Sequence, residues 1–145
     1  MATTVEAVTR VVALLTEIDG LTVFEGTVPK DPPRDAEGRV KPYVCVYMGS
    51  GETRNTRYGY KPRDLSLPIW VTCSAGTPRG ANWAVDKVRP VLNGVRLFAT
   101  PEDPRLGDSR LREVTENVAL REDRDIPTDL RWFLPMQYRF ATTIS

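Results

Sequence analysis

The first part of the chain alternates between helical and extended hydrophobic patterns. Apolar residues recur every three or four positions, as on one face of a helix, at Val5, Val8, Val12 and Leu15, with Val11 and Ile18 widening the stripe. Gly20 is placed to end this helix. The pattern predicts a helix from about Thr4 to Glu17, followed by a short strand from Leu21 to Glu25.

Two extended segments follow, each preceded by a long polar segment. The region from Pro29 to Pro42 is rich in proline and lacks apolar periodicity, which predicts a loop. β-Branched and aromatic residues from Tyr43 to Met48 then predict a central strand. After a second polar segment, strict alternation predicts a strand with one apolar face, formed by Leu65, Leu67, Ile69, Val71 and Cys73.

The middle of the chain shows a second helical pattern. Its apolar positions are Ala81, Ala84, Val85, Val88, Leu92 and Val95. Thr77 is a suitable N-cap, and Pro78 suits the first helical position, where its missing N–H costs nothing. We expect Pro90 to kink or shorten this helix and Asn93–Gly94 to close it.

The last third of the chain predicts further strands. A brief strand is expected from Arg96 to Ala99, and a strand with one wet face from Val114 to Glu122. The clearest strand runs from Leu130 to Ile144, with Trp132, Leu134, Met136, Tyr138 and Phe140 on its apolar face and Arg131, Gln137 and Arg139 on the other. Its expected partner is the Val114–Glu122 strand. Pro68 and Pro135 each remove a backbone donor, which places both at an edge or a bulge.

These elements predict an α+β fold with a mainly antiparallel β-sheet covered by two α-helices and long inter-strand loops. The 145 residues suit a single domain spanning 1–145. Two loops of roughly 14 residues are uncommon in a domain of this size, and such loops are usually functional or disordered.

The amino-acid composition excludes several classes of function. The chain has no histidine, which excludes Ser-His-Asp and Cys-His catalytic arrangements and histidine-based zinc sites. The formal net charge of +1 provides no global field to attract nucleic acid or an anionic membrane. No apolar run approaches the ~20 residues of a membrane span, and the N-terminus lacks a signal-peptide pattern, so we expect folding in a cytoplasm.

The segment from Thr72 to Ala84 most resembles a catalytic site. A phosphate-binding loop would need a GxxxxGK[ST] pattern and a nucleophile turn a GxSxG pattern, and the sequence has neither. We therefore interpret Gly76 as a turn residue and this segment as a connection, with a weak anion site at the helix start as the alternative. Cys45 and Cys73 lie in apolar runs and are expected to be buried, reduced thiols.

Two acidic groups could suggest metal ligands. Glu102, Asp103 and Asp108 form one group, and Asp123, Asp125 and Asp129 form the other. Neither has the EF-hand pattern, and arginines alternate with both groups. We interpret both as solvated turns, and the sequence predicts no metal or cofactor.

The second polar segment holds the best candidate for a functional surface. Its cations alternate with tyrosines: Arg54, Arg57, Tyr58, Tyr60, Lys61 and Arg63. Tyrosine and arginine are enriched at protein interfaces, and the near-neutral chain favours a protein-contact loop. A solvated hairpin and a single-stranded nucleic-acid site, in which bases stack on the tyrosines, remain alternatives.

The complete layout resembles the tail terminator family of long-tailed bacteriophages. The similarity covers nearly the whole length and lies in element order: the N-terminal helix, the strands VFEGTVP, PYVCVYMG and LPIWVTC, a helix ending in VLNGV, and the closing strand WFLPMQYRFATTI. The first loop departs from the family in its charged, Pro-rich insert. The resemblance implies an α+β fold, assembly into a six-membered ring on the tail tube, and no catalytic residue or cofactor.

The resemblance also implies a set of partners. The chain would bind copies of itself in a ring, the tail tube protein and the head–tail connector or neck protein, and it would belong to the virion after assembly in the host cytoplasm. A passing contact with genomic DNA in the bore stays open, and no membrane is involved. The Arg54–Arg63 loop would contact a subunit or the tube, and the Pro29–Pro42 loop a neighbour or the neck. The alternatives are another head–tail neck or connector-completion protein, a small nucleic-acid-binding domain, and, least favoured, an enzyme acting through the Gly76 turn.

Overall fold

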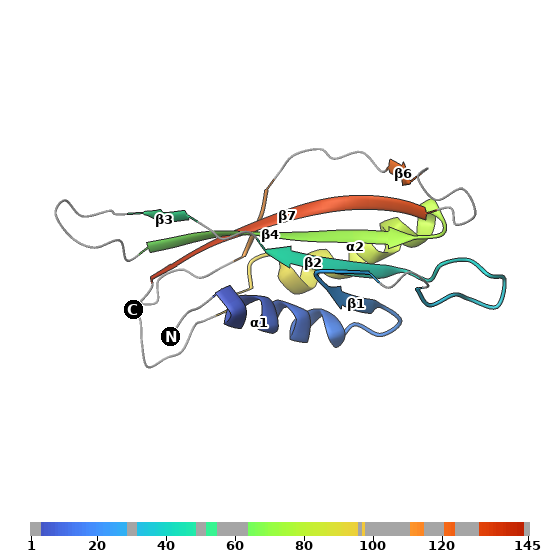
Figure 1. Ribbon diagram of the computed structural model, residues 1–145, viewed down its shortest axis with the longest axis horizontal. Coiled ribbons are helices and arrows are strands. Elements are labelled where there is room, and N and C mark those ends of the chain that lie inside the picture. The colour runs from blue at the N-terminus through green and yellow to red at the C-terminus, as the bar shows by residue number, and fades with distance from the viewer. Residues whose placement is uncertain are drawn as a thin grey trace.

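The computed structural model confirms an α+β fold in which two helices pack on a mostly antiparallel sheet (Figure 1). The structure describes residues 4–28, 32–48, 52–54, 64–95, 97, 111–114, 121–123 and 131–143. Its elements are α1 (Thr4–Thr16), β1 (Thr22–Glu25), β2 (Tyr43–Met48), β3 (Glu52–Arg54), β4 (Asp64–Ala75), α2 (Pro78–Leu92), β5 (Arg112–Glu113), β6 (Arg121–Asp123) and β7 (Arg131–Thr143).

The sheet is built on its two longest strands. β4 and β7 pair antiparallel along their whole length, from Asp64 opposite Thr143 to Ala75 opposite Trp132. β2 pairs antiparallel with β4, and β1 adds to β2 in parallel, so the strand order across the described part is β1-β2-β4-β7-β5. The short strand β3 pairs with β4, and β6 pairs with β7.

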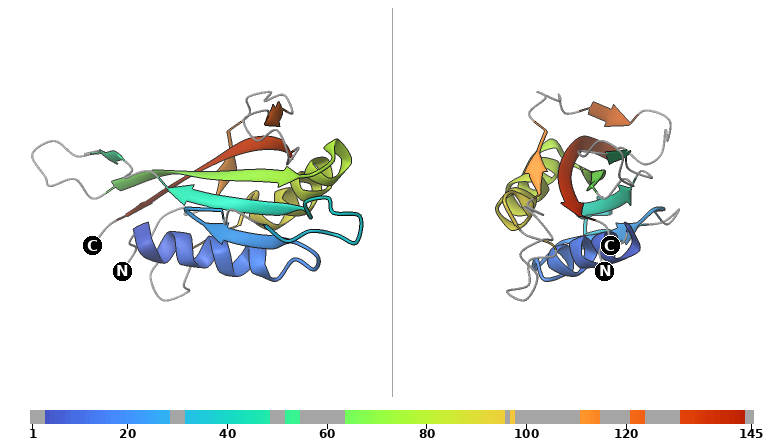
Figure 2. Two further views of the ribbon diagram at one scale, coloured as in Figure 1. Left: turned by 45° about the vertical axis from the view of Figure 1, so that its right-hand side comes forward. Right: turned by 90° about the vertical axis from the view of Figure 1, so that its left-hand side faces the viewer.

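Both helices lie on the same face of the sheet, and the core lies between them and the strands (Figure 2). The residues with no exposed surface come from both helices and from the sheet: Ala7, Val11 and Leu15 of α1, Val44 and Val46 of β2, Leu67, Ile69, Val71 and Cys73 of β4, and Ala84, Val88 and Leu92 of α2. Met136 and Tyr138 extend this core onto β7. The alternation predicted for β4 is confirmed from Leu67 to Cys73, and on β7 Met136 and Tyr138 lie on the buried face as predicted.

The buried face of α1 differs from the predicted stripe. Ala7, Val11 and Leu15 are fully buried, whereas Val5 is 72% exposed. At about 100° per residue, Val5 lies about 200° around the helix from Ala7 and therefore points away from the sheet. Valine occupies positions 5, 8, 11 and 12, on several sides of the helix, so the apolar pattern of the sequence did not show which side would be buried.

The end of α2 agrees with the sequence except at proline. Pro90 lies within the helix, which continues to Leu92 before ending. Asn93 is the C-cap, and Gly94 has φ of 80°, the left-handed conformation that glycine adopts without strain. Val95 lies beyond the helix and is half-buried against the core. Pro90 removes the backbone hydrogen bond that residue 90 would donate to the Asp86 carbonyl, and only two helical residues follow it before the helix ends.

The predicted loop from Pro29 to Pro42 is confirmed over its described part, which contains no helix or named strand and is closed by a tight turn. Arg34 and Val40 form an antiparallel bridge, and Asp35 accepts hydrogen bonds from the backbone of Glu37 and Arg39, both at 2.9 Å. Val40 is 4% exposed. Composition indicated a loop because the Asp35 side chain, rather than strand propensity, provides the acceptors that close this turn.

The strand predicted from Val114 to Glu122 is replaced by two short strands. β5 pairs Arg112 with Arg139, and β6 pairs Arg121 with Phe133, so both contact β7 as expected. The chain between Glu113 and Arg121 has three more residues than β7 has between Tyr138 and Phe133, so one register cannot span both pairs. The brief strand predicted at Arg96–Ala99 lies outside the described residues except for Leu97, which is buried.

Pro68 and Pro135 both lie where a long strand changes its neighbour. On β4, Pro68 falls between the β2 pairing, which ends at Ile69, and the β3 pairing, which begins at Ser66. On β7, Pro135 falls between the β6 and β5 pairings. A missing backbone donor costs little at such local edges. Among the described residues, Pro68 and Pro135 therefore have a paired strand on one side only, as expected for a local edge.

Candidate interaction surfaces

The arginine- and tyrosine-rich segment lies mostly outside the described residues. Arg54 is the last residue of β3 and pairs with Asp64 of β4, while Arg57, Tyr58, Tyr60, Lys61 and Arg63 fall in the undescribed segment between the two strands. Figure 1 shows β3 and the start of β4 at one end of the sheet, beyond the helices. The segment therefore connects the two strands of a hairpin, and its role in contact stays a prediction.

The Thr72–Ala84 segment is a structural joint. Thr77 has extended backbone angles, and its Oγ1 accepts a hydrogen bond from the Gly80 backbone N–H at 3.1 Å, while Pro78 takes the first helical position. Gly76 does not have a positive φ. A Cβ at Gly76 would lie 2.8 Å from the backbone nitrogen of Val40, so this glycine, which lies at the bend between β4 and α2 as expected, also permits a close backbone approach.

Replacing Thr77 by alanine is expected to lower the free energy of unfolding by about 1 kcal/mol, because the Gly80 N–H at the start of α2 loses its acceptor. Thr77→Ser retains the hydroxyl and should recover most of this loss. Urea denaturation followed by circular dichroism measures both variants. Equal losses in the two variants would contradict capping through Oγ1.

The two cysteines are buried and not paired with each other, as predicted. Burial raises the pKa of the Cys73 thiol to about 12, and its Sγ lies 3.8 Å from Sδ of Met136 in the core. Burial also raises the pKa of Cys45, against hydrogen bonds from Tyr47 and Gly26 that lower it. Both thiols stay protonated near neutral pH, whereas a nucleophile or metal ligand would need the thiolate.

In the described part of the chain, an ion pair joins α2 to β5, and a buried tyrosine of β7 lies opposite the acidic partner of that pair. Arg89 Nε of α2 lies 3.1 Å from Glu113 Oε1 of β5, with half of the arginine side chain exposed. Tyr138, opposite Glu113 on β7, is fully buried, and its hydroxyl has no partner among the described residues. Burial raises the pKa of Tyr138, and the nearby Glu113 raises it further. The phenol is therefore neutral at any physiological pH.

The described residues do not bring together a metal-binding set. No group of three or more Cys, Asp or Glu side chains within the described ranges could hold a metal ion. Asp123 is the last residue of β6, and the other five acidic residues singled out in the sequence lie outside the described residues. Among the helices that the structure describes, none is long and apolar enough to cross a membrane.

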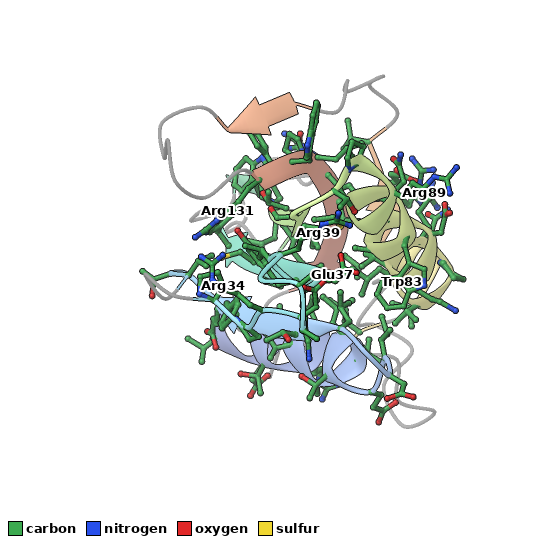
Figure 3. All side chains as sticks on the ribbon, turned by 90° about the vertical axis from the view of Figure 1, so that its right-hand side faces the viewer. Arg34, Glu37, Arg39, Trp83, Arg89 and Arg131 are labelled. Atoms are coloured by element: carbon green, nitrogen blue, oxygen red, sulfur yellow. The ribbon has the colours of Figure 1, made fainter. Side chains whose placement is uncertain are left out.

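The sheet face opposite the helices carries an aromatic cluster at one end. Tyr43 of β2 is 5% exposed and packs edge-to-face against Phe24 of β1, with ring centroids 5.7 Å apart. Arg131 of β7 donates a hydrogen bond to the Tyr43 hydroxyl at 3.2 Å and lies over its ring at 6.0 Å. Figure 3 shows Arg131 across the strands from Arg89 and Trp83 of α2.

The alternation of β7 places Arg131 on the face opposite its apolar residues, yet Arg131 is only 8% exposed. The guanidinium is stabilised there by the Tyr43 hydroxyl and by the electron-rich face of the same ring. The sequence placed Tyr43 and Arg131 correctly on strands but gave no sign of their contact. They are 88 residues apart, and only the β2-β4-β7 register brings them together.

Further along the same face, Tyr47 and Trp70 are exposed side by side. They are register partners on β2 and β4, and 38% and 36% of their surface is accessible. Arg139 of β7 is exposed on the same face, two residues beyond Gln137, the register partner of Trp70. Arg112 of β5 lies opposite Arg139 and is also exposed. We call Tyr47, Trp70, Arg112 and Arg139 the sheet patch.

The sheet patch was missed by the sequence analysis. Trp70 falls at one of the non-core positions of its strand, between Pro68 and Thr72. A large aromatic residue on the face expected to contact solvent was the signal that could have indicated an interaction surface. Exposed tryptophan and tyrosine beside arginine is the composition of protein interfaces. Comparisons of the chain with models of known families and with curated proteins gave no match.

Proposed function

We propose that this chain is a structural protein of a long-tailed bacteriophage that caps the tail tube as a ring, ends tail polymerisation and provides the surface for head joining. Two findings support the proposal. The fold has the α+β class that the sequence resemblance implies, and its exposed aromatic residues lie on a sheet face that no described helix covers. The exposed Tyr47–Trp70 pair carries the proposal, because such pairs suit burial against another protein.

The hairpin formed by β3 and β4 supplies a second surface for this function. Its two strands are joined by the segment from 55 to 63, which contains the tyrosines and most of the cations expected to contact a subunit or the tube. The turn from 32 to 41, which would face a neighbour or the neck, is held in place by a hydrogen bond from the Gly76 N–H to the Val40 carbonyl at 2.9 Å. A preformed turn loses less conformational entropy on binding.

Native mass spectrometry tests the proposal most directly. We expect either a six-membered ring or a monomer that assembles into a ring when purified tail tubes are added. Electron microscopy should then show the ring at one end of the tubes, and tube extension should stop. A chain that stays monomeric and ignores tubes would refute the proposal.

The partner that the ring binds distinguishes the proposed function from the alternative, a neck or connector-completion protein. A ring that binds purified heads or connectors but not tail tubes would favour that alternative. Binding to single-stranded DNA that weakens with salt, without any assembly, would favour a nucleic-acid-binding domain instead.

A further inference from the structure

The outer face of α1 forms a second exposed surface, on the opposite side of the molecule from the sheet patch. Val5, Thr9, Ala13 and Thr16 lie along one side of the helix at spacings of three or four residues, and all are exposed. Val5 is the most exposed large hydrophobic residue of the described chain, at 72%. These four residues and Glu17 are called the helix patch.

The helix patch is less polar than its threonines indicate. Thr9 Oγ1 donates to the Val5 carbonyl at 2.8 Å, and Thr16 Oγ1 donates to the Val12 carbonyl at 2.6 Å. Each hydroxyl proton is therefore used within the helix itself. What remains for a partner is the small side chains of Thr9, Ala13 and Thr16 beside the exposed Val5.

The C-terminal end of α1 concentrates negative charge. Glu17 and Asp19 follow the last turn, which contains no basic residue, and both are exposed. The carbonyl end of a helix already carries a partial negative charge, so these carboxylates stand where a cation is favoured. The sheet patch has the opposite character, because Arg139 and Arg112 place two positive charges directly opposite each other on β7 and β5.

We propose that a second copy of this chain seats its helix patch on the sheet patch, with Glu17 of one copy against Arg139 of the next. The inference rests on the proposed ring function and names its subunit interface. The two patches carry opposite charge, and the side chains of the helix patch are small where those of the sheet patch are large and aromatic. Because the two patches are different surfaces of one molecule, one on α1 and one on the sheet face that α1 does not cover, the contact is head-to-tail and repeats into a ring or a filament.

The sizes of the two surfaces agree. A helix of 13 residues is about 20 Å long, and the four strands that carry the sheet patch span about 15 Å at their usual spacing. A specific interface of standard size buries about 800 Å² on each partner, so this contact would also bury residues that flank both patches.

Charge reversal tests this contact. Arg139→Glu and Glu17→Arg should each weaken assembly at least about tenfold, measured by native mass spectrometry and light scattering, because each brings like charges together across the interface. Both variants should fold normally. Arg139→Glu places an acid opposite Arg112, and Glu17→Arg places a cation at the helix end where it is favoured.

An equimolar mixture of the two variants gives the decisive result. In an alternating ring, the native Glu17 of the first variant meets the native Arg139 of the second. At the next contact the introduced arginine meets the introduced glutamate, so every contact is again attractive. We expect the mixture to recover assembly that neither variant achieves alone. Arg79→Glu and Asp86→Arg, which reverse exposed charges on α2, serve as matched controls and should assemble like the wild type.

The outcomes separate this inference from the proposed function. Wild-type rings with normal assembly of both variants, or with no recovery in the mixture, would overturn the interface and leave the ring function standing. A wild type that stays monomeric with and without tail tubes would overturn both. Normal assembly of Arg139→Glu combined with lost binding to a single-stranded oligonucleotide would assign the sheet patch to nucleic acid and overturn the interface.

Discussion

Replacing Ile69 by alanine is expected to lower the free energy of unfolding by about 2–5 kcal/mol, whereas replacing its neighbour Trp70 should cost about 1 kcal/mol or less. Ile69 has no exposed surface and lies in the core between the sheet and the helices, so its truncation leaves a cavity. Trp70 points to the opposite face of β4 and is 36% exposed. The larger side chain should therefore contribute less to stability.

Urea denaturation of dilute, monomeric protein measures both variants, since assembly would add to the apparent stability. The same Trp70→Ala protein should lose assembly, because its indole lies in the sheet patch. A Trp70→Ala variant that unfolds as easily as Ile69→Ala would show that the face opposite the helices is covered within the monomer.

The free energy of unfolding is expected to fall steeply as the pH rises above about 9. The pKa of Cys73 is 9.0 without burial and about 12 in the folded protein. Below pH 9 the thiol is protonated in both states and adds no pH dependence. Between pH 9 and about 12 the unfolded chain loses this proton while the folded protein keeps it, so stability is lost, at up to about 1.36 kcal/mol for each pH unit.

Tyr138 acts in the same direction, because burial raises its pKa above the ordinary value of 10.0. Removing both ionisable groups with Cys73→Val and Tyr138→Phe should flatten the decline, as measured by urea denaturation at a series of alkaline pH values. Tyr138→Phe alone should also be neutral or stabilising at pH 7, because the hydroxyl is buried without a partner in the described chain. A double variant with the wild-type alkaline decline would assign the effect to other groups.

The elements that local chemistry controls were predictable. Thr77, Pro78 and the Asn93–Gly94 pair marked the ends of α2, because caps act within a few residues. Strict alternation located β4 and β7 because their one buried face requires it. The loop from 32 to 41 was also predictable from its composition, but the Asp35 side chain, which accepts the backbone hydrogen bonds that fix its turn, was not singled out.

The candidate surfaces were predictable only in part. The sequence identified the segment from Arg54 to Arg63 by its composition, and the structure shows that β3 and β4 flank it. It did not identify Tyr47, Trp70 and Arg139 as one surface, because these residues come from three strands. Their proximity depends on the register between β2, β4 and β7, which no single segment encodes.

Sequence periodicity was sufficient for the fold class, the cores of the long elements and the burial of both cysteines, because each follows from which side chains avoid water locally. Tertiary structure decided which surfaces of these helices and strands pack against one another. It placed Val5 outside, buried Arg131 against Tyr43, set Gly76 against Val40 and left Tyr47 beside Trp70 on an open face. These outcomes depend on contacts between distant segments, whose geometry exists only once the strands have paired and the helices have packed on one side.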